Sequence, residues 1–151
     1  MTSNNSLDIQ APAIAPIALG TAAAAVGLNA LGVYADGKGG DASTAEFLVI
    51  TGVIVVASAL VIGLLVPRVL DSTKAGAVGL VLAVFAALFV PVFWSGLTPA
   101  FAVGGILLGL SARHAGSRTG LGTAAIVIGA LAGMAYVALY VGDWMSTNGI
   151  I

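Results

Sequence analysis

The chain has 151 residues, of which 60% are hydrophobic and 7% charged, and it contains no cysteine. Soluble domains carry about 25% charged residues, so this composition and a mean hydropathy of +1.13 exclude an ordinary soluble domain, a disordered tail and a coiled coil. A net charge of −1 excludes a nucleic-acid binder, which needs basic residues to neutralise phosphates. The composition therefore indicates an integral membrane protein.

Long apolar segments divide the chain into predicted spans. A membrane-spanning helix needs about 20 mostly apolar residues, and continuous rather than alternating apolar runs favour helices over a β-barrel. Five segments meet or approach this length: about 13–34, 46–66, 75–93, 99–112 and 120–141. We predict an all-α bundle of five transmembrane helices in one domain, 13–145, between a polar N-terminal segment, 1–12, and a C-terminal tail, 146–151.

Local signals mark the ends of these spans. Residues Ser43 to Glu46 match a capping box that opens the second span, and Pro67 ends it. Thr98 is the expected N-cap of the fourth span, with Pro99 in its first turn. This span rises only about 21 Å, so a re-entrant hairpin is the alternative.

The distribution of basic residues predicts the orientation, because Lys and Arg near helix ends mark the cytoplasmic face. Five spans place Arg68, Lys74, Arg113 and Arg118 on one side, with Lys38 as the exception. Every Trp and Tyr falls on the opposite half. We expect a multi-pass protein of the bacterial plasma membrane with its N-terminus inside and its C-terminus outside. No basic segment precedes the first span, which we expect to be an uncleaved anchor.

Few side chains in the predicted spans can carry chemistry. An ionisable residue inside a membrane would indicate function, but only Glu46, at the mouth of the second span, comes close. The single histidine, His114, lies beside Arg113 in a predicted loop; we expect it to be solvated, with acid–base or lipid-headgroup roles as alternatives. Asp36 and Asp41 lack the spacing of a calcium loop. We expect no catalytic residue, metal or cofactor.

Asn29 is the most notable polar side chain within the first predicted span. We expect it to form a hydrogen bond to another helix, which contributes around 1 kcal/mol in a bilayer. The alternatives are that Asn29 lines a pathway or contacts a cofactor held by a partner.

Glycines at four-residue spacing mark the last two predicted spans: Gly105 and Gly109 in one, Gly129 and Gly133 in the other. Such spacing puts small residues on one side of a helix and lets two backbones approach closely. A chain that folds back between these spans would place Gly105 near Gly129 and Gly109 near Gly122. We predict a tightly packed hairpin here, with docking to a partner protein as a second use of the glycines.

The same region carries a family resemblance. Residues 101–114 form an apolar segment with Leu-Gly that ends in Arg-His, and residues 119–130 follow with Gly-x-Gly, Ala and Ile-x-x-Gly. This arrangement resembles a hairpin of small bacterial membrane proteins of unknown function, and the Ala- and Gly-rich composition is similar to that of actinobacterial membrane proteins. The resemblance implies a membrane hairpin and brings no activity with it.

These observations favour a non-catalytic accessory subunit packed against a larger bacterial membrane complex, with a respiratory oxidase or cytochrome supercomplex as the first candidate. The expected partners are other membrane protein subunits and membrane lipids, not nucleic acid. The alternative is a small homo-oligomeric channel or transporter, with Asn29, Thr51 and Ser58 lining the pore. A membrane enzyme that uses His114 and Arg113 is a third possibility.

Overall fold

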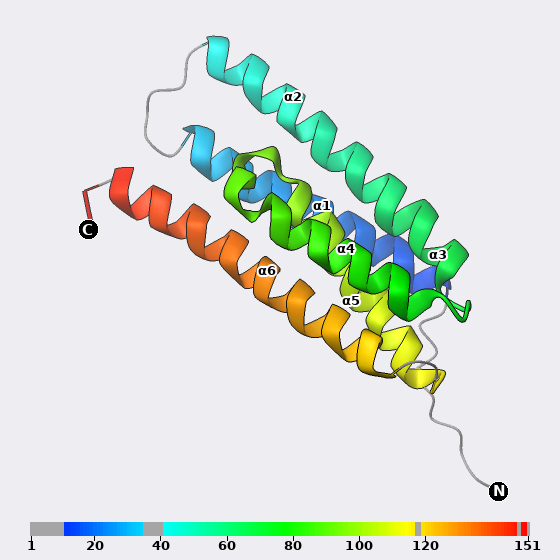
Figure 1. The fold of residues 1–151 in the computed structure, drawn as a ribbon. Helices are drawn as coiled ribbons and strands as arrows, with labels where there is room; N and C mark the ends of the chain where they lie inside the picture. The colour runs from blue at the N-terminus through cyan, green and yellow to red at the C-terminus, as the bar shows by residue number, and fades with distance from the viewer. Residues whose placement is uncertain (1–10, 35–40, 117–118, 148, 151) are drawn as a thin grey trace, which may run out of the picture.

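The computed structural model describes residues 11–34, 41–116, 119–147 and 149–150, and its regular structure in these ranges is entirely helical. The elements are α1 (Ala11–Tyr34), α2 (Asp41–Ser58), the π-helix η1 (Ala59–Leu65), α3 (Val66–Val69), α4 (Ala75–Phe89), the 3-10 helix η2 (Val90–Ser95), α5 (Leu97–His114) and α6 (Thr119–Thr147). Helices α2, η1 and α3 follow one another without a break, as do α4 and η2. The resulting rods run back and forth along one bundle, so α1 begins at one end and α6 finishes at the other (Figure 1).

Within the described ranges, four helical segments are long and apolar enough to cross a membrane. They are Ala13–Tyr34, Thr44–Val69, Ala75–Ser95 and Thr119–Thr147. The prediction of an all-α chain with membrane-spanning helices is therefore confirmed in its coarser form. Exposed large apolar side chains such as Leu19, Leu48 and Leu131 cover the outside of the bundle, as contact with lipid requires.

Helix α5 is the most enclosed element of the bundle. It packs against α4 and α6 and also contacts α1 and α2. Its buried positions are mostly small or aliphatic: Thr98, Ala100, Ala102, Gly104, Gly105, Leu107, Leu108, Gly109 and Ala112. Because neighbouring helices cover α5, its own surface needs less apolar character than that of a lipid-facing helix.

The predicted start of the second span is wrong by a few residues. A Ser-x-x-Glu pattern opens a helix only where the serine stands just before the first helical residue. Helix α2 already begins at Asp41, so Ser43 and Glu46 both lie within its first turns. The expected capping box therefore does not open this helix.

Pro67 does not end the second span either. Proline has no N–H to donate within a helix, and its ring clashes with the carbonyl four residues earlier. Just before it the helix adopts π geometry, in which the N–H of Val66 donates to the carbonyl of Val61. Regular helix then continues to Val69, and the N–H of Leu70 donates to Val66 at 2.9 Å. The widened π turn accommodates the proline without breaking the rod.

Gly96, not Thr98, is the N-cap of α5, which corrects the prediction at this turn. Gly96 has φ 67, and its N–H donates to the carbonyl of Phe93 at 3.1 Å. A Cβ atom at Gly96 would lie 2.2 Å from Cγ1 of Ile54 in α2, so the turn requires glycine for both its conformation and its contact. Thr98 then falls inside the helix, where its side chain is fully buried.

Candidate functional site

Gly109 and Gly122 bring α5 and α6 into backbone contact. A Cβ atom on Gly109 would lie 2.6 Å from the carbonyl oxygen of Gly122, and one on Gly122 would lie 2.7 Å from the oxygen of Gly109. The structure therefore places these two glycines opposite each other, at the position expected from the hairpin. Neither position has room for a side chain without separating the helices.

The other expected pair does not form. Gly105 lies against α4, where its Cβ would be 2.9 Å from the carbonyl oxygen of Gly79, and Gly129 lies against Ala102, with 3.0 Å to its oxygen. The pairing of Gly105 with Gly129 is wrong because α5 packs between α4 and α6, whereas the prediction considered only the α5–α6 hairpin. At Gly133 the described atoms leave open space within 4 Å, so this glycine makes no close helix contact.

Asn29 is only 3% exposed, yet its amide nitrogen Nδ2 has no hydrogen-bond partner in the described part of the chain. This nitrogen therefore makes no interhelical hydrogen bond within the described residues, and an interhelical bond through the side-chain oxygen of Asn29 stays a prediction. The hydroxyls of Ser58 and Thr51 are also buried, and the described residues offer them no partner. Asn29 and Ser58 lie inside the chain, whereas a pore between subunits needs polar side chains on the outer surface.

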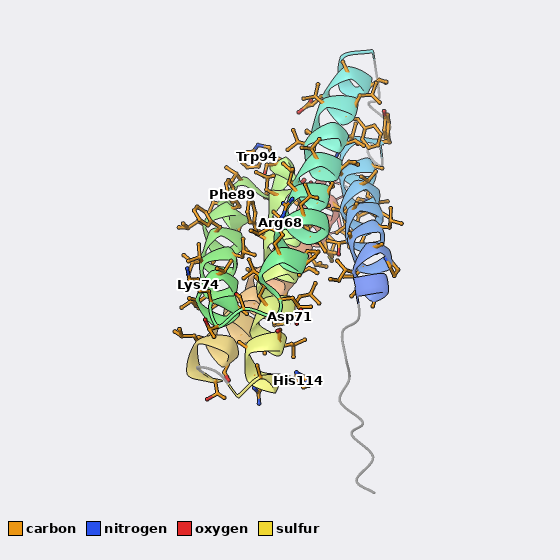
Figure 2. All side chains as sticks on the ribbon, turned by 90° about the vertical axis from the view of Figure 1, so that its right-hand side faces the viewer. Arg68, Asp71, Lys74, Phe89, Trp94 and His114 are labelled. Atoms are coloured by element: carbon orange, nitrogen blue, oxygen red, sulfur yellow. The ribbon has the colours of Figure 1, made fainter. Side chains whose placement is uncertain are left out.

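The described basic residues gather at one end of the bundle. Arg68 lies in α3, Lys74 just before α4 and Arg113 in the last turn of α5, and all three are exposed. Arg68 and Lys74 are labelled in Figure 2. His114 is exposed beside them, and its Nδ1 lies 2.8 Å from the carbonyl oxygen of Leu110. Such a solvated ring offers no enclosed site for catalysis.

Some of the predicted loop residues fall outside the described ranges. These are Asp36, Lys38 and Arg118. In the described segments, no group of three His, Cys, Asp or Glu side chains is arranged to hold a metal ion.

An open groove of about 950 Å³ runs between α1 and α6, with α5 as its floor. Its walls include Gly20 and Ala24 of α1 and Gly129 and Gly133 of α6, and Ala102 of α5 lies at its base. These small residues leave room between helices that would otherwise touch. A cavity of this size with mostly apolar walls lies within the usual range of small-molecule sites.

Buried polar side chains gather where this groove runs toward the C-terminal ends of α1 and α6. Tyr136 lines the groove and is 1% exposed, and Tyr140, one turn further along α6, is 6% exposed. Their ring centroids are 5.0 Å apart. A Cβ atom on Gly32 of α1 would lie 3.2 Å from Cε1 of Tyr140, and Asn29 lies one turn before Gly32. Helices α1 and α6 run in parallel (Figure 1), so Asn29 precedes the contact of Gly32 with Tyr140 along α1 as Tyr136 precedes it along α6.

We refer to Asn29, Tyr136 and Tyr140 as the polar cluster. Its amide nitrogen and its two hydroxyl oxygens are buried, and none of them has a hydrogen-bond partner among the described residues outside the cluster. Burying such groups unpaired is costly in a bilayer, where water does not compensate them. Sequence reasoning used the tyrosines only as markers of the half opposite the basic residues. The signal that could have found the cluster was the i, i+4 spacing of Tyr136 and Tyr140 on one side of a long apolar helix.

A second groove, of about 550 Å³, lies between α2 and α5 and is lined by apolar residues including Val53, Leu60 and Phe101. The polar cluster distinguishes the first groove from it.

Comparison with protein-family models, curated proteins and solved structures gave no match to this chain. The function of the chain therefore has to follow from its own geometry.

Proposed function

We propose that the chain is a non-catalytic accessory subunit that packs against a larger membrane complex through its first two helices. The observation that carries the proposal is the outward placement of their glycines. Gly27 of α1, Gly52 of α2 and Gly63 of η1 are exposed, and a Cβ atom at each would meet nothing in the described chain within 4 Å.

The α2–η1 rod combines Gly52 and Gly63 with other exposed residues, and Gly52 and Val56 also line the open groove between α2 and α5. Gly52, Val56, Ala59 and Gly63 follow one another at spacings of four, three and four residues, and all are exposed. Lipid tails are as apolar as aliphatic side chains, so lipid contact alone does not require small residues. Glycine and alanine on a lipid-facing helix instead allow the backbone of a second helix to approach closely.

The proposal includes five spans, in which α5 crosses the membrane surrounded by the other helices. In this arrangement the end with Arg68, Lys74 and Arg113 faces the cytoplasm of a bacterial cell, following the positive-inside rule. Trp94 lies at the opposite end of α4 from Lys74, at the level expected for an outer aromatic belt (Figure 2). A respiratory oxidase or cytochrome assembly is the first complex to test.

Co-purification from native membranes in a mild detergent tests this proposal. We expect the tagged wild-type chain to recover a catalytic membrane complex at fixed stoichiometry. Gly63→Leu should reduce that recovery by about tenfold, which corresponds to a loss of about 1.4 kcal/mol in binding. Gly142→Leu is the matched control, because Gly142 of α6 also has open space around it and lies away from α2.

Two results would contradict the proposal. Equal recovery of the complex by wild type and Gly63→Leu would show that the α2–η1 rod is not part of the interface. Purification of a self-oligomer without other subunits would favour the channel or transporter, for which the burial of Asn29 and Ser58 gives no support.

A further inference from the structure

We propose that the groove between α1 and α6 binds an uncharged lipid with a long apolar chain and a head group that bears carbonyl oxygens, the chemistry of a prenylated quinone. The proposal rests on the groove and the polar cluster and does not depend on the partner complex proposed above.

The length of the groove suits the apolar chain of such a lipid. Its lining extends over residues 17–28 of α1 and 129–141 of α6. A helix rises about 1.5 Å per residue, so the groove is roughly 17 Å long. This length is close to half of the hydrocarbon core of about 30 Å, which is the depth of one leaflet. A chain lying in the leaflet therefore enters the groove along its open side.

Small residues hold this space open. Gly133 lines the groove, and a Cβ atom there would meet nothing within 4 Å among the described atoms. Gly20 on the facing helix has the same open surroundings. Glycine at these positions is thus not needed for contact between α1 and α6, in contrast to the tightly packed Gly109. A larger side chain at Gly133 would occupy the groove without displacing a neighbouring helix.

The polar cluster supplies hydrogen-bond donors for the head group. An asparagine Nδ2 is a donor and a tyrosine hydroxyl can donate, and in this cluster none has a partner among the described residues outside the cluster. Tyr136 comes first, because it lines the groove itself. The ring of Tyr140 packs against that of Tyr136, and Asn29 lies on α1 one turn before Gly32, which contacts Tyr140. A ligand that satisfies several donors must carry acceptors, and carbonyl oxygens meet this need.

Charge at this end of the bundle favours an uncharged head group over a phosphate. The described basic residues Arg68, Lys74 and Arg113 lie at the other end. Near the polar cluster, Asp143 is the charged residue on the last turns of α6. A phosphate would bring a second negative charge toward Asp143, whereas a flat neutral ring with two carbonyl oxygens can pack against the tyrosine rings.

The test measures lipid bound to the full-length protein. The purified chain is placed in phosphatidylcholine vesicles with and without a prenylated quinone, recovered by its tag, and the bound quinone and phospholipid are quantified per chain by mass spectrometry. We expect about one quinone per wild-type chain, as a single site requires. Gly133→Leu should lower this amount by about tenfold.

Variants of the polar cluster test the head group. Tyr136→Phe and Asn29→Leu should each weaken quinone binding roughly three- to tenfold, the loss expected for one hydrogen bond. Thr51→Val is the matched control for a lost buried hydroxyl, because Thr51 lies on α2 away from the groove. Gly142→Leu is the control for added bulk on α6. Both controls should bind as wild type does.

Three outcomes would overturn the proposal. These are no quinone retained by the wild-type chain, a tightly held phospholipid in its place, and wild-type binding by Gly133→Leu. If Gly133→Leu does not fold, Tyr136→Phe decides the question, since it removes only one hydroxyl. Unchanged binding by Tyr136→Phe would then exclude the polar cluster as the head-group site.

Discussion

Helices α4, α5 and α6 pack backbone against backbone, whereas α1 and α2 leave most of their glycines open. A Cβ atom on Gly79, Gly105 or Gly109 would lie within 3.1 Å of a carbonyl oxygen or amide nitrogen of another helix, but one on Gly27 or Gly52 would meet no described atom within 4 Å. The two regions have similar glycine-rich sequences. Glycine therefore allows backbone contact between α4, α5 and α6, whereas most glycines of α1 and α2 have open surroundings, as Gly133 of α6 also does.

The first two helices join the three-helix unit through a few specific contacts. Ile54 of α2 fills the space beside Gly96, and the hydroxyl of Ser111 in α5 donates to the carbonyl of Leu70 at the end of α3. A buried apolar cluster that includes Ile62 and Leu108 completes the connection. Substitutions in the two regions should therefore differ strongly in their cost.

The largest effect is expected for Gly109→Leu. The leucine side chain would meet the carbonyl oxygen of Gly122 at a distance that backbone atoms do not tolerate. Overpacking usually costs 1–3 kcal/mol, and a clash with backbone between two helices should exceed about 3 kcal/mol. We expect little monodisperse protein after detergent extraction. Gly27→Leu, with open surroundings, should give wild-type yields; equal losses for both variants would refute the distinction between the two regions.

A smaller effect is expected for Gly96→Ala, which acts on the junction of the two regions. The positive φ of Gly96 costs an alanine about 1 kcal/mol, and the contact with Ile54 adds to this. We expect a loss of about 2 kcal/mol in unfolding free energy, measured by thermal unfolding in detergent. Adding Ile54→Ala should relieve the clash but not the backbone strain, so a double-mutant cycle should show coupling. Strict additivity would show that the contact does not matter.

Ser111→Ala should cost less still, because it removes one hydrogen bond between α5 and the carbonyl of Leu70. Hydrogen bonds between membrane helices contribute about 0.6 kcal/mol on average. The same unfolding assay should show a decrease of this size. Thr123→Ala is the control, since its hydroxyl donates within its own helix, to Thr119 at 2.9 Å, and it should be close to neutral. Equal effects would mean that Ser111 does not connect the two regions.

The smallest effect is expected for Gly63→Leu in the isolated protein. Its side chain would extend into free space on the outside of η1, so the unfolding free energy should stay within about 0.5 kcal/mol of wild type. If Gly63→Leu leaves the unfolding free energy unchanged but reduces recovery of the partner complex, Gly63 acts at the interface and not in the stability of the chain. A large destabilisation would place Gly63 in the core after all.

Much of the fold could be predicted from the sequence. The long apolar segments predicted the helical class, and the pair Gly109 and Gly122 followed from folding the chain back on itself. The helix boundaries at Asp41, Val69 and Gly96 differ from the predicted ones. A π turn lets the helix continue past Pro67, and Gly96, in a left-handed conformation, is the N-cap in place of Thr98. Local sequence does not show how a helix adjusts to a neighbour.

Apolar composition alone was enough to establish that the chain forms helices suited to a bilayer, because hydrocarbon leaves backbone groups no other partner. Which residues meet depends on the packing of these helices. Gly105 faces Gly79 because α5 lies between two helices, and Tyr140 contacts Gly32 because α6 packs against α1. Both placements depend on how helices that are distant in the chain are positioned and rotated relative to one another. The sequence does not determine this arrangement, because every helix face is hydrophobic.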